Sequence, residues 1–249
     1  MKIILHADDF GRSPIISKNI IDCIDQGRIN QVSVMMGFVD EGIHKKLIKK
    51  KINTRLHLNL TENKFLNKKN NRDFTFIELL FLAKKDRKII FNEIVKQISE
   101  YSKIYKTKKI KLDGHQHVHM IPWIYKYIYN LKLYKISEIR YSDEKFIYFN
   151  SRILFKLKFY RNLLAWLLIK LLSLKNKRRY NYKFYGLIFS DIFNENLLKN
   201  LINKSSKDSE ILLHPGFTNN KEKRLFNNYF FKYYSSKQRQ LEKKILLKL

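Results

Sequence analysis

The sequence predicts an α/β protein built around a parallel sheet, either a closed or partial barrel or an open, doubly wound sheet. Strand-like and helix-like stretches alternate along the chain through about seven strands, which is the pattern of repeated strand–helix units. Acidic, basic and imidazole side chains follow the ends of several of these strands, and in (β/α) barrels the chemistry gathers at that rim. The second observation favours a barrel similar to a TIM barrel, with about seven strands.

The expected strands are short apolar or alternating runs. They lie at residues 2–7, 31–36, 54–60, 110–113, 136–141, 185–190 and 210–214. In the third run, Arg55, His57 and Asn59 share one face while leucines share the other, as period-two alternation requires. The expected helices begin at Pro14 and Pro122, lie at 42–51, 75–85, 90–106 and 194–204, and end the chain.

The first helix shows how the helix ends are predicted. Ser13 suits the N-cap and Pro14 the first helical position, because proline lacks the N–H that is unpaired there anyway. Isoleucines then recur every four residues, and Gly27 stands where a C-terminal cap belongs. At 249 residues the chain is long enough for a substantial core, and we expect one domain over residues 1–249.

Residues 151–183 interrupt the alternation. An apolar run over 163–174 is flanked by lysines and arginines, and Lys170 divides it, so no apolar stretch of about 18 residues is present. The segment is either a pair of inserted helices that cap the barrel or a basic amphipathic segment that rests on a membrane surface. We expect the inserted helices.

The formal net charge of +29 is the strongest bias in the composition. Such a charge is typical of proteins that bind nucleic acid or anionic membranes. The lysines are scattered through a chain that is also rich in Ile, Asn, Phe and Tyr, as the codon bias of an AT-rich genome produces. We interpret the charge as a solvated basic surface and expect no specific nucleic acid as a partner, since no nucleic-acid motif is present.

The cysteine content and the N-terminus indicate a compartment. Cys23 is the only cysteine, so it has no partner for an intramolecular disulfide, and it falls among the apolar residues of a predicted helix as a buried thiol would. Only three apolar residues precede His6, far fewer than a secretory signal needs. We expect a cytoplasmic protein.

Two adjacent carboxylates, Asp8 and Asp9, follow the first expected strand. Neighbouring side chains rarely point the same way on an extended backbone, so one can bind a metal while the other lies beside the reacting water. Asp-Asp-x-Gly is also a good turn sequence, and the pair alone leaves both interpretations open.

Histidines supply the other candidate ligands. The segment Asp113-Gly-His-Gln-His-Val-His119 places three at alternate positions, which would share one face on an extended backbone, although we do not expect one site to use all three together with His57. His214 ends an apolar strand before a proline that restricts it to an extended conformation. A rigid histidine suits a general acid, and a strand-terminating turn is the alternative.

Four blocks of sequence resemble a known family. They are His6-Ala-Asp-Asp-Phe-Gly11, His57-Leu-Asn-Leu-Thr61, Asp113-Gly-His-Gln-His-Val-His119 and His214-Pro-Gly216. In these blocks, which span roughly residues 3–216 in family order, the chain resembles the YdjC-like carbohydrate deacetylases, also called chitooligosaccharide deacetylases. Together the blocks are specific, whereas any one of them alone would not be.

The resemblance implies a deacetylase-type (β/α) barrel, often incomplete relative to eight strands, with a divalent metal bound by an aspartate and two histidines. Matched by position, these metal ligands are Asp9, His57 and His115. Two histidines favour zinc, while a single carboxylate and a wet site also admit magnesium. The expected cofactor is therefore one Mg²⁺ or Zn²⁺ ion.

The resemblance also implies catalytic roles. By analogy with the related polysaccharide deacetylases, Asp8 would be the general base and His214 the general acid, and Arg140 or Asp113 would orient neighbouring groups. We therefore expect a metal-dependent hydrolase that removes the N-acetyl group from an N-acetylated sugar or oligosaccharide, giving acetate and an amino sugar.

Two alternatives remain at this point. The first is a metal-dependent hydrolase of a phosphorylated or lipid-linked sugar at a membrane surface, with a weak membrane contact through 151–183. The second is a non-enzymatic basic binding module, which leaves the ligand-rich strand ends unexplained. An N-acetylated carbohydrate is the expected partner, and the sequence leaves a homodimer open.

Overall fold

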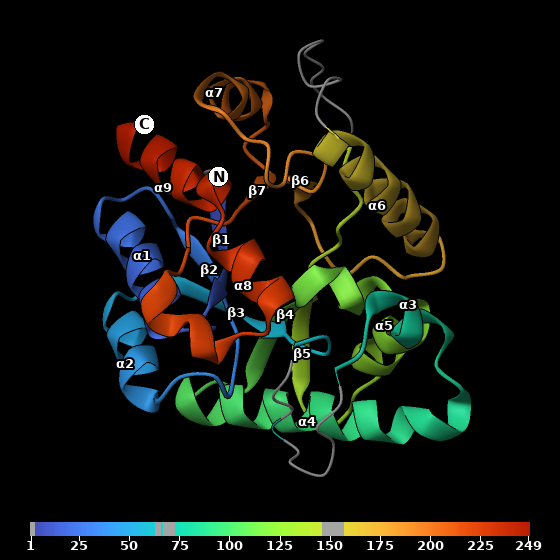
Figure 1. Ribbon diagram of the computed structural model, residues 1–249. Coiled ribbons are helices and arrows are strands. Elements are labelled where there is room, and N and C mark those ends of the chain that lie inside the picture. Colours follow the sequence, from blue (N-terminus) through green and yellow to red (C-terminus); the bar gives the residue numbers. More distant parts are fainter. Residues whose placement is uncertain (1–2, 63–65, 67–72, 146–156) are drawn as a thin grey trace.

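The computed structural model describes residues 3–62, 66, 73–145 and 157–249. Its central sheet consists of parallel strands β1 (Ile4–Phe10), β2 (Gln31–Val34), β3 (Asn53–Leu58), β4 (Lys109–Gly114), β5 (Lys135–Ile139), β6 (Lys183–Tyr185) and β7 (Ser209–Leu213). They lie in the order β5-β4-β3-β2-β1-β7-β6, and the sheet curls into a half-barrel (Figure 1). The predicted α/β class and the incomplete, seven-stranded barrel are confirmed.

Helices surround the curled sheet (Figure 1). They are α1 (Pro14–Asp25), α2 (Glu41–Lys49), α3 (Phe76–Phe81), α4 (Arg87–Ile104), α5 (Pro122–Tyr129), α6 (Leu157–Ser173), α7 (Glu195–Lys204), α8 (Asn228–Tyr234) and α9 (Lys237–Lys248), with 3₁₀ turns η1 (Lys84–Asp86), η2 (His115–Met120) and η4 (Asn220–Leu225). Leucines on one face of β3 are fully buried, as are isoleucines of α4. The opposite face of β3 carries Arg55 and His57, so the interior of the half-barrel is polar.

The sheet stays open between its two edge strands, β5 and β6. Across this opening the backbone N–H of Ile139 donates to the carbonyl oxygen of Arg179 at 3.3 Å. The chain that leads into β6 therefore lies beside the end of β5 and partly covers the opening.

The first helix has the ends that its sequence predicts. The Ser13 hydroxyl accepts a hydrogen bond from the backbone N–H of Ile16, and α1 starts at Pro14. Gly27 follows the C-cap residue with φ +68°, a left-handed conformation that glycine adopts without strain. Cys23 is buried on the core side of this helix, as expected, and burial raises the pKa of its thiol to about 11.

The expected strand at 185–190 is wrong beyond its first residue. β6 ends at Tyr185, and Gly186 has φ +116°; a Cβ there would lie 2.5 Å from the carbonyl oxygen of Leu212. Residues 187–190 turn instead. Leu187, Ile188 and Phe189 are all buried, so the apolar run reflects burial of a loop.

The segment 151–183 also differs from the expected pair of helices. Residues 151–156 lie outside the described residues, and the remainder forms one helix, α6, followed by a connection into β6. None of the helices in the described part of the chain combines the length and the apolar content needed to cross a bilayer.

Candidate functional site

Asp8 and Asp9 lie near the end of β1, and both side chains are buried. Asp9 has φ +69°, and the pairing of β1 with β2 shifts register between Ala7 and Phe10. This irregularity interrupts the alternation of the strand, so that both carboxylates approach His57 Nε2, at 3.8 Å from Asp8 and 3.4 Å from Asp9. Aspartate tolerates a left-handed backbone better than most residues.

The next residue but one, Gly11, completes this local geometry. It has φ +85°, and a Cβ at this position would lie 2.5 Å from the Met35 carbonyl oxygen. The glycine that ends the Asp-Asp-Phe-Gly sequence therefore allows the chain after β1 to pass close to the end of β2.

Asp9, His57 and His115 form a buried cluster of three potential metal ligands. Asp9 Oδ1 lies 3.1 Å from His115 Nδ1 and 3.4 Å from His57 Nε2, and one ligand atom from each residue lies within 4.8 Å of the others. The two imidazole rings meet edge to face with centroids 5.5 Å apart. One carboxylate and two imidazoles suit a divalent transition-metal ion.

A further carboxylate lies beside the far nitrogen of each imidazole. His57 Nδ1 is 2.6 Å from Asp113 Oδ1, and His115 Nε2 is 3.0 Å from Glu62 Oε1. When the Nδ1–H of His57 donates to Asp113, the Nε2 lone pair faces Asp9, which is unfavourable unless a proton or metal cation lies between them. Metal-ligating histidines commonly donate to a carboxylate in this way, so the residues present fit a divalent metal.

The carboxylates also determine whether these imidazoles are protonated. Burial alone lowers the pKa of His57, but the charges of Asp8 and Asp113 outweigh it and raise the pKa to about 10. Burial also lowers the pKa of His115, and the hydrogen bond to Asp9 leads the contributions that raise it above its ordinary value. At neutral pH, a proton on His57 therefore supplies positive charge that these carboxylates favour.

A second cluster, His6, Asp8 and Asp113, also brings three potential ligands together. Positive charge is already present there, because Arg140 donates to the two oxygens of Asp8 at 2.9 and 3.0 Å and lies 3.0 Å from Asp113. His6 Nε2 lies 2.6 Å from the Ser33 hydroxyl. The guanidinium of Arg140 supplies the positive charge that a metal ion would otherwise bring, and we assign no metal to this cluster.

Arg140 follows β5 and is fully buried. Burial alone would raise the pKa of Asp8, but the charge of Arg140 leads the contributions that lower it to about 2. The Nε–H of Arg140 donates to Glu210 on β7 at 2.7 Å. One guanidinium therefore connects three strands of the half-barrel and keeps Asp8 ionised and fixed in orientation.

Arg239, on α9, is a site residue that the sequence did not predict. Its Nη2 donates to Asp9 Oδ2 at 2.8 Å and its Nη1 to the Gly216 carbonyl at 3.0 Å. Asp9 thus uses one oxygen for Arg239 and keeps the other toward the histidines. Burial alone raises the pKa of Asp9, but Arg239 leads the opposing contributions, and the pKa lies well below its usual range.

Two buried glutamates were also missed. Glu62 accepts from Tyr234 at 2.6 Å and from Arg12, and thereby faces His115. Glu210 accepts from Tyr180 and Arg140 inside the half-barrel. Glu62 directly follows the His57–Thr61 block, so its position carried a local signal, whereas Glu210 looked like an ordinary strand residue.

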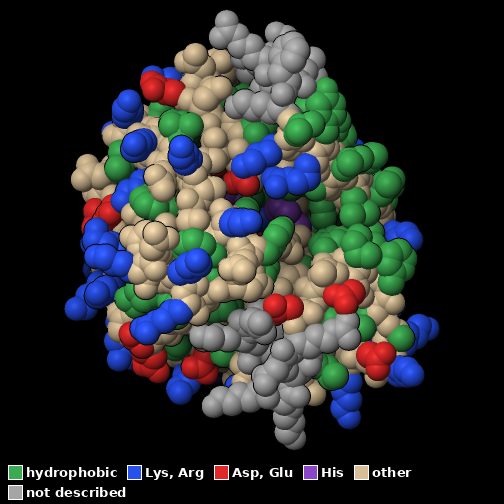
Figure 2. Space-filling model, viewed as in Figure 1, with side chains coloured by type: hydrophobic (Ala, Val, Ile, Leu, Met, Phe, Trp, Pro, Cys, Tyr) green, Lys and Arg blue, Asp and Glu red, His purple; other side chains and the backbone are tan. Residues whose placement is uncertain are grey.

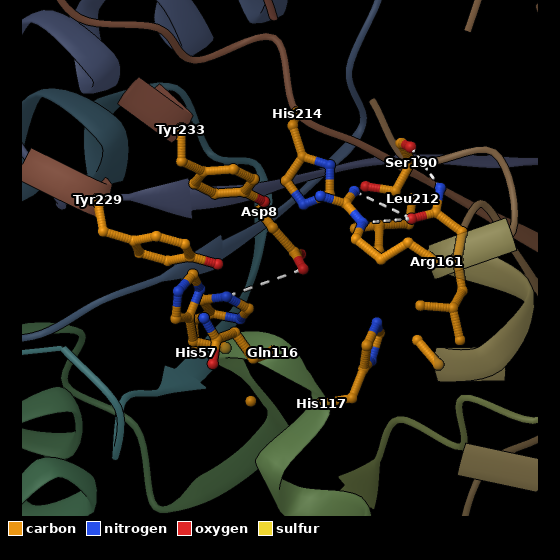
Figure 3. A pocket seen from close by; sticks show the side chains of 15 residues that line it. Asp8, His57, Gln116, His117, Arg161, Ser190, Leu212, His214, Tyr229 and Tyr233 are labelled. Atoms are coloured by element: carbon orange, nitrogen blue, oxygen red, sulfur yellow. Dashed lines mark hydrogen bonds and ion pairs between the residues drawn. The ribbon is translucent and has the colours of Figure 1, made fainter. Parts of the chain in front are cut away.

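His57 and His115 of the Asp9–His57–His115 cluster line a pocket of about 330 Å³, together with Asp8, while Asp9 is buried behind them (Figure 3). Tyr229 and Tyr233 of α8, with His214, stand on one side of the pocket, and Arg161 of α6 and His117 stand on the other. The α6 segment, which interrupts the alternation in sequence, is therefore one wall of this pocket.

The three closely spaced histidines separate in the structure. Gln116 and His117 have left-handed φ values of 52° and 57°, so the backbone is not extended here and the three histidines do not share a face. His115 enters the metal-ligand cluster, His117 Nδ1 lies 2.9 Å from the Ser142 hydroxyl, and His119 Nε2 lies 3.0 Å from the carbonyl oxygen of Arg140.

His214 follows β7 and borders the pocket opposite Arg161 (Figure 3). Its backbone N–H donates to buried Glu242 at 2.7 Å, and its ring Nδ1 is buried without a hydrogen-bond partner among the described residues. Burial, followed by the charge of Arg239, lowers the pKa of His214 to about 4. The ring is therefore neutral at neutral pH and has a free nitrogen.

Comparison with known proteins agrees with this geometry. A family model described as YdjC-like protein matches residues 2–248. A carbohydrate deacetylase of Mus musculus is 25% identical over 138 residues, and one of Danio rerio is 27% identical over 135 residues. These alignments cover 50% and 49% of this chain but 44% and 43% of the relatives, so the chain aligns with less than half of their length.

A solved structure supports the fold independently. It comes from Enterococcus faecalis V583 and is provisionally described as a cellobiose-phosphate cleavage protein. It matches with a TM-score of 0.65 and 18% identity, over 99% of this chain and 90% of that chain. The likeness therefore extends over the whole half-barrel.

Proposed function

The chain belongs to the YdjC-like protein family, and on that premise we propose that it removes the N-acetyl group from an N-acetylated sugar or oligosaccharide. The observation that carries the proposal is the Asp9–His57–His115 cluster at the base of a pocket, with Asp8 held beside it by Arg140. The products would be acetate and an amino sugar. Two relatives that are named carbohydrate deacetylase are similar to about half of this chain, and this similarity supports the choice of reaction.

We infer that Asp9, His57 and His115 hold one divalent metal ion, Mg²⁺ or Zn²⁺. The two imidazoles favour zinc by ligand softness, and the carboxylate also suits magnesium. When bound there, such an ion would polarise the acetamide carbonyl and lower the pKa of the attacking water. Asp113 and Glu62 would keep both imidazoles in the orientation for binding.

Asp8 is proposed as the general base. It lines the pocket, and Arg140 keeps its carboxylate ionised and aimed toward His57. A pKa of about 2 makes Asp8 a weak base, so proton removal needs water that is made more acidic at the neighbouring cluster. Arg140 and Asp113 act as positioning residues.

His214 is proposed as the group that protonates the departing amine. Its ring borders the pocket, and its backbone is fixed by Pro215 and Glu242. With a pKa of about 4 the ring is neutral at neutral pH, so it would have to take up a proton, such as the one that Asp8 removes from water, before it passes a proton to the amine nitrogen as the C–N bond breaks. The amine then leaves in a neutral form.

The test is acetate release from N-acetylated chitooligosaccharides by protein supplied with Zn²⁺ or Mg²⁺. Asp9→Asn keeps a residue that tolerates the left-handed backbone and removes the charge, so acetate release should fall about 100-fold or more. Glu138→Gln is the matched control, because Glu138 is a partly exposed carboxylate of β5 outside the pocket. If the parent protein binds metal but releases no acetate, these oligosaccharides are not its substrates, and the assignment of the metal ligands is unaffected.

A second candidate is hydrolysis of a phosphorylated or lipid-linked sugar at the same site. Arg161 on the pocket wall favours it, because a guanidinium is a good partner for phosphate. The two candidates separate by product. Acetate from a phosphorylated N-acetyl sugar would support deacetylation of an anionic substrate, and release of inorganic phosphate would support phosphoester hydrolysis.

A further inference from the structure

The helix α6 exposes an unbroken apolar face to solvent. The exposed fractions are 88% for Leu157, 48% for Tyr160, 70% for Leu164, 47% for Leu167, 55% for Leu171 and 79% for Leu174. These residues are spaced alternately three and four apart, so the five within α6 lie along one side, and Leu174 directly follows the helix. Figure 2 shows the apolar side chains gathered in a continuous strip over α6. We call these six residues the leucine strip.

Positive charge borders the leucine strip. Lys158 and Arg161 lie 3.9 and 3.6 Å from buried Asp191, and Lys170 lies 3.9 Å from Asp143, so each has one acidic neighbour at long range on the protein side. Lys158 and Arg161 lie on the side of α6 toward the pocket, and Lys170 lies on the other side, with side chains 48%, 57% and 44% exposed. From Leu157 to Tyr180 the chain contains seven lysines and arginines and no aspartate or glutamate. An apolar helix face with cations along its borders is the arrangement of helices that lie in the surface of an anionic bilayer.

A second copy of this chain is a less suitable partner for the same face. Spacing of three and four residues also occurs in coiled coils, where oppositely charged side chains border the apolar seam. If two leucine strips packed together, Lys158, Arg161 and Lys170 of one copy would meet the same cations of the other segment, with partly exposed Asp143 as an acidic neighbour beside Lys170. Like charges at such positions are destabilising, whereas an anionic lipid surface would neutralise them.

We propose that the leucine strip docks on an anionic lipid bilayer, with α6 lying along the surface. A helix of 17 residues is about 25 Å long, which suits it to lie in the headgroup region, and it lacks the apolar length to span the bilayer. The same helix supplies Arg161, Asn162 and Ala165 to the pocket wall. Docking would therefore bring the pocket close to the bilayer.

A pocket at the bilayer surface would suit a lipid-linked substrate, and this part of the inference rests on the proposed deacetylation. An N-acetyl sugar attached to a lipid would present its acetamide at the depth of the headgroups, beside the pocket. Arg161, at the border between the leucine strip and the pocket, would meet phosphate between lipid and sugar. A soluble oligosaccharide would reach the pocket without using the leucine strip.

The docking test is co-sedimentation of the full chain with vesicles of phosphatidylglycerol and phosphatidylcholine, compared with phosphatidylcholine alone. Leu164→Asn with Leu171→Asn changes two exposed side chains outside the pocket and should weaken binding to the mixed vesicles about tenfold or more. Phe81→Asn with Leu133→Asn is the matched control, because these side chains are 78% and 69% exposed and lie outside α6. Added salt should weaken binding of the parent.

Two results would overturn the docking proposal. One is a parent that binds neither kind of vesicle, and the other is a strip variant that binds as well as the parent. Light scattering during chromatography identifies the competing partner: a parent dimer that the strip variant converts to a monomer, without lipid binding, would assign the strip to a second copy.

Activity measured on two substrates separates this proposal from the proposed function. With an N-acetylglucosamine-bearing lipid in the mixed vesicles, the strip variant should release acetate at least about tenfold more slowly than the parent, and with a soluble N-acetylated oligosaccharide at the same rate. Vesicle binding without acetate from either substrate would keep the docking and reject the deacetylation. Acetate from the soluble substrate without vesicle binding would support the deacetylation and reject the docking.

Discussion

Each imidazole of the Asp9–His57–His115 cluster lies between two carboxylates, and their negative charge favours a proton or a metal cation on the ring. Asp113 contacts the far nitrogen of His57, and Glu62 lies at the far nitrogen of His115. The pKa of both rings is raised as a consequence. A divalent ion that binds here must replace the protons on these rings.

Metal affinity should therefore rise with pH. Below the pKa of about 10 at His57, protons compete with the metal, and the competition weakens as the pH rises toward that value. Titration calorimetry with Zn²⁺ in two buffers of different ionisation enthalpy should detect proton release at neutral pH. His44→Asn is the control, since burial lowers the pKa of His44 to about 4 and its ring is already neutral. Binding without proton release would contradict the assignment of these ligands.

His214 should matter for turnover and not for metal binding. His214→Ala should reduce kcat about 10²- to 10⁴-fold, the range for loss of a proton-transfer group, while calorimetry shows unchanged metal affinity. His214→Gln keeps a hydrogen-bond donor of similar size but cannot transfer the proton. If His214→Gln restores the rate, the ring acts only as a hydrogen-bond donor, and an unchanged rate in His214→Ala would remove it from the mechanism.

At the scale of elements, the strand ends explain why the sequence located most of the site. Parallel strands deliver the side chains at their carboxyl ends to one rim, and apolar runs identified those ends to within a few residues for β1, β3, β4, β5 and β7. Asp8, Asp9, His57, His115 and Arg140 accordingly meet around one centre.

The rest of the site depends on packing that no local pattern encodes. Arg239 lies 230 residues from Asp9, and the packing of α9 against α1 brings the two together. Glu210 stands at the start of β7 before three consecutive apolar residues, so nothing in its neighbourhood shows that it faces Arg140 across the half-barrel. The left-handed turn at Gln116 and His117 likewise breaks the extended backbone on which His115, His117 and His119 would share a face.

The contact between α9 and β1 should be necessary for the metal-ligand cluster. Arg239→Met removes the partner of Asp9 Oδ2 and leaves a buried carboxylate less compensated, which typically costs about 3–5 kcal/mol. Its urea midpoint should fall, and metal affinity should fall with it because Asp9 loses its orientation. Lys243→Met is the control on the same helix, since Lys243 contacts Asp22 outside the site. Equal effects of both substitutions would make Arg239 an ordinary helix contact.

At the scale of the whole molecule, the half-barrel has a charged interior surrounded by an apolar layer. Asp8, Asp113 and Glu210 contact Arg140, and Arg55 lies 3.6 Å from Glu210. Buried ion pairs of this kind contribute little net stability, but loss of charge on one partner is strongly destabilising. The buried charges therefore position the site, and they also make the stability of the folded protein depend on pH.

Stability should be greatest between about pH 5 and 7 and fall on both sides. Asp8 has a pKa of about 2 in the folded protein, below the roughly 3.9 of an unfolded chain. Its contribution is present above the unfolded value and is lost as the pH falls through the folded value, and Asp9 and Asp113 act in the same direction. His57, with its raised pKa, contributes below about 6.5 and loses its contribution as the pH rises toward about 10.

Urea midpoints measured across this pH range test the prediction, and salt separates its two causes. Protonation of carboxylates also increases a formal charge that is already +29, and the resulting repulsion between surface charges would destabilise the protein at low pH as well. Salt screens exposed charges but hardly affects buried pairs. An acid-side loss that persists in high salt and becomes shallower in Asp8→Asn would assign it to the interior, whereas a loss that salt abolishes would assign it to the basic surface.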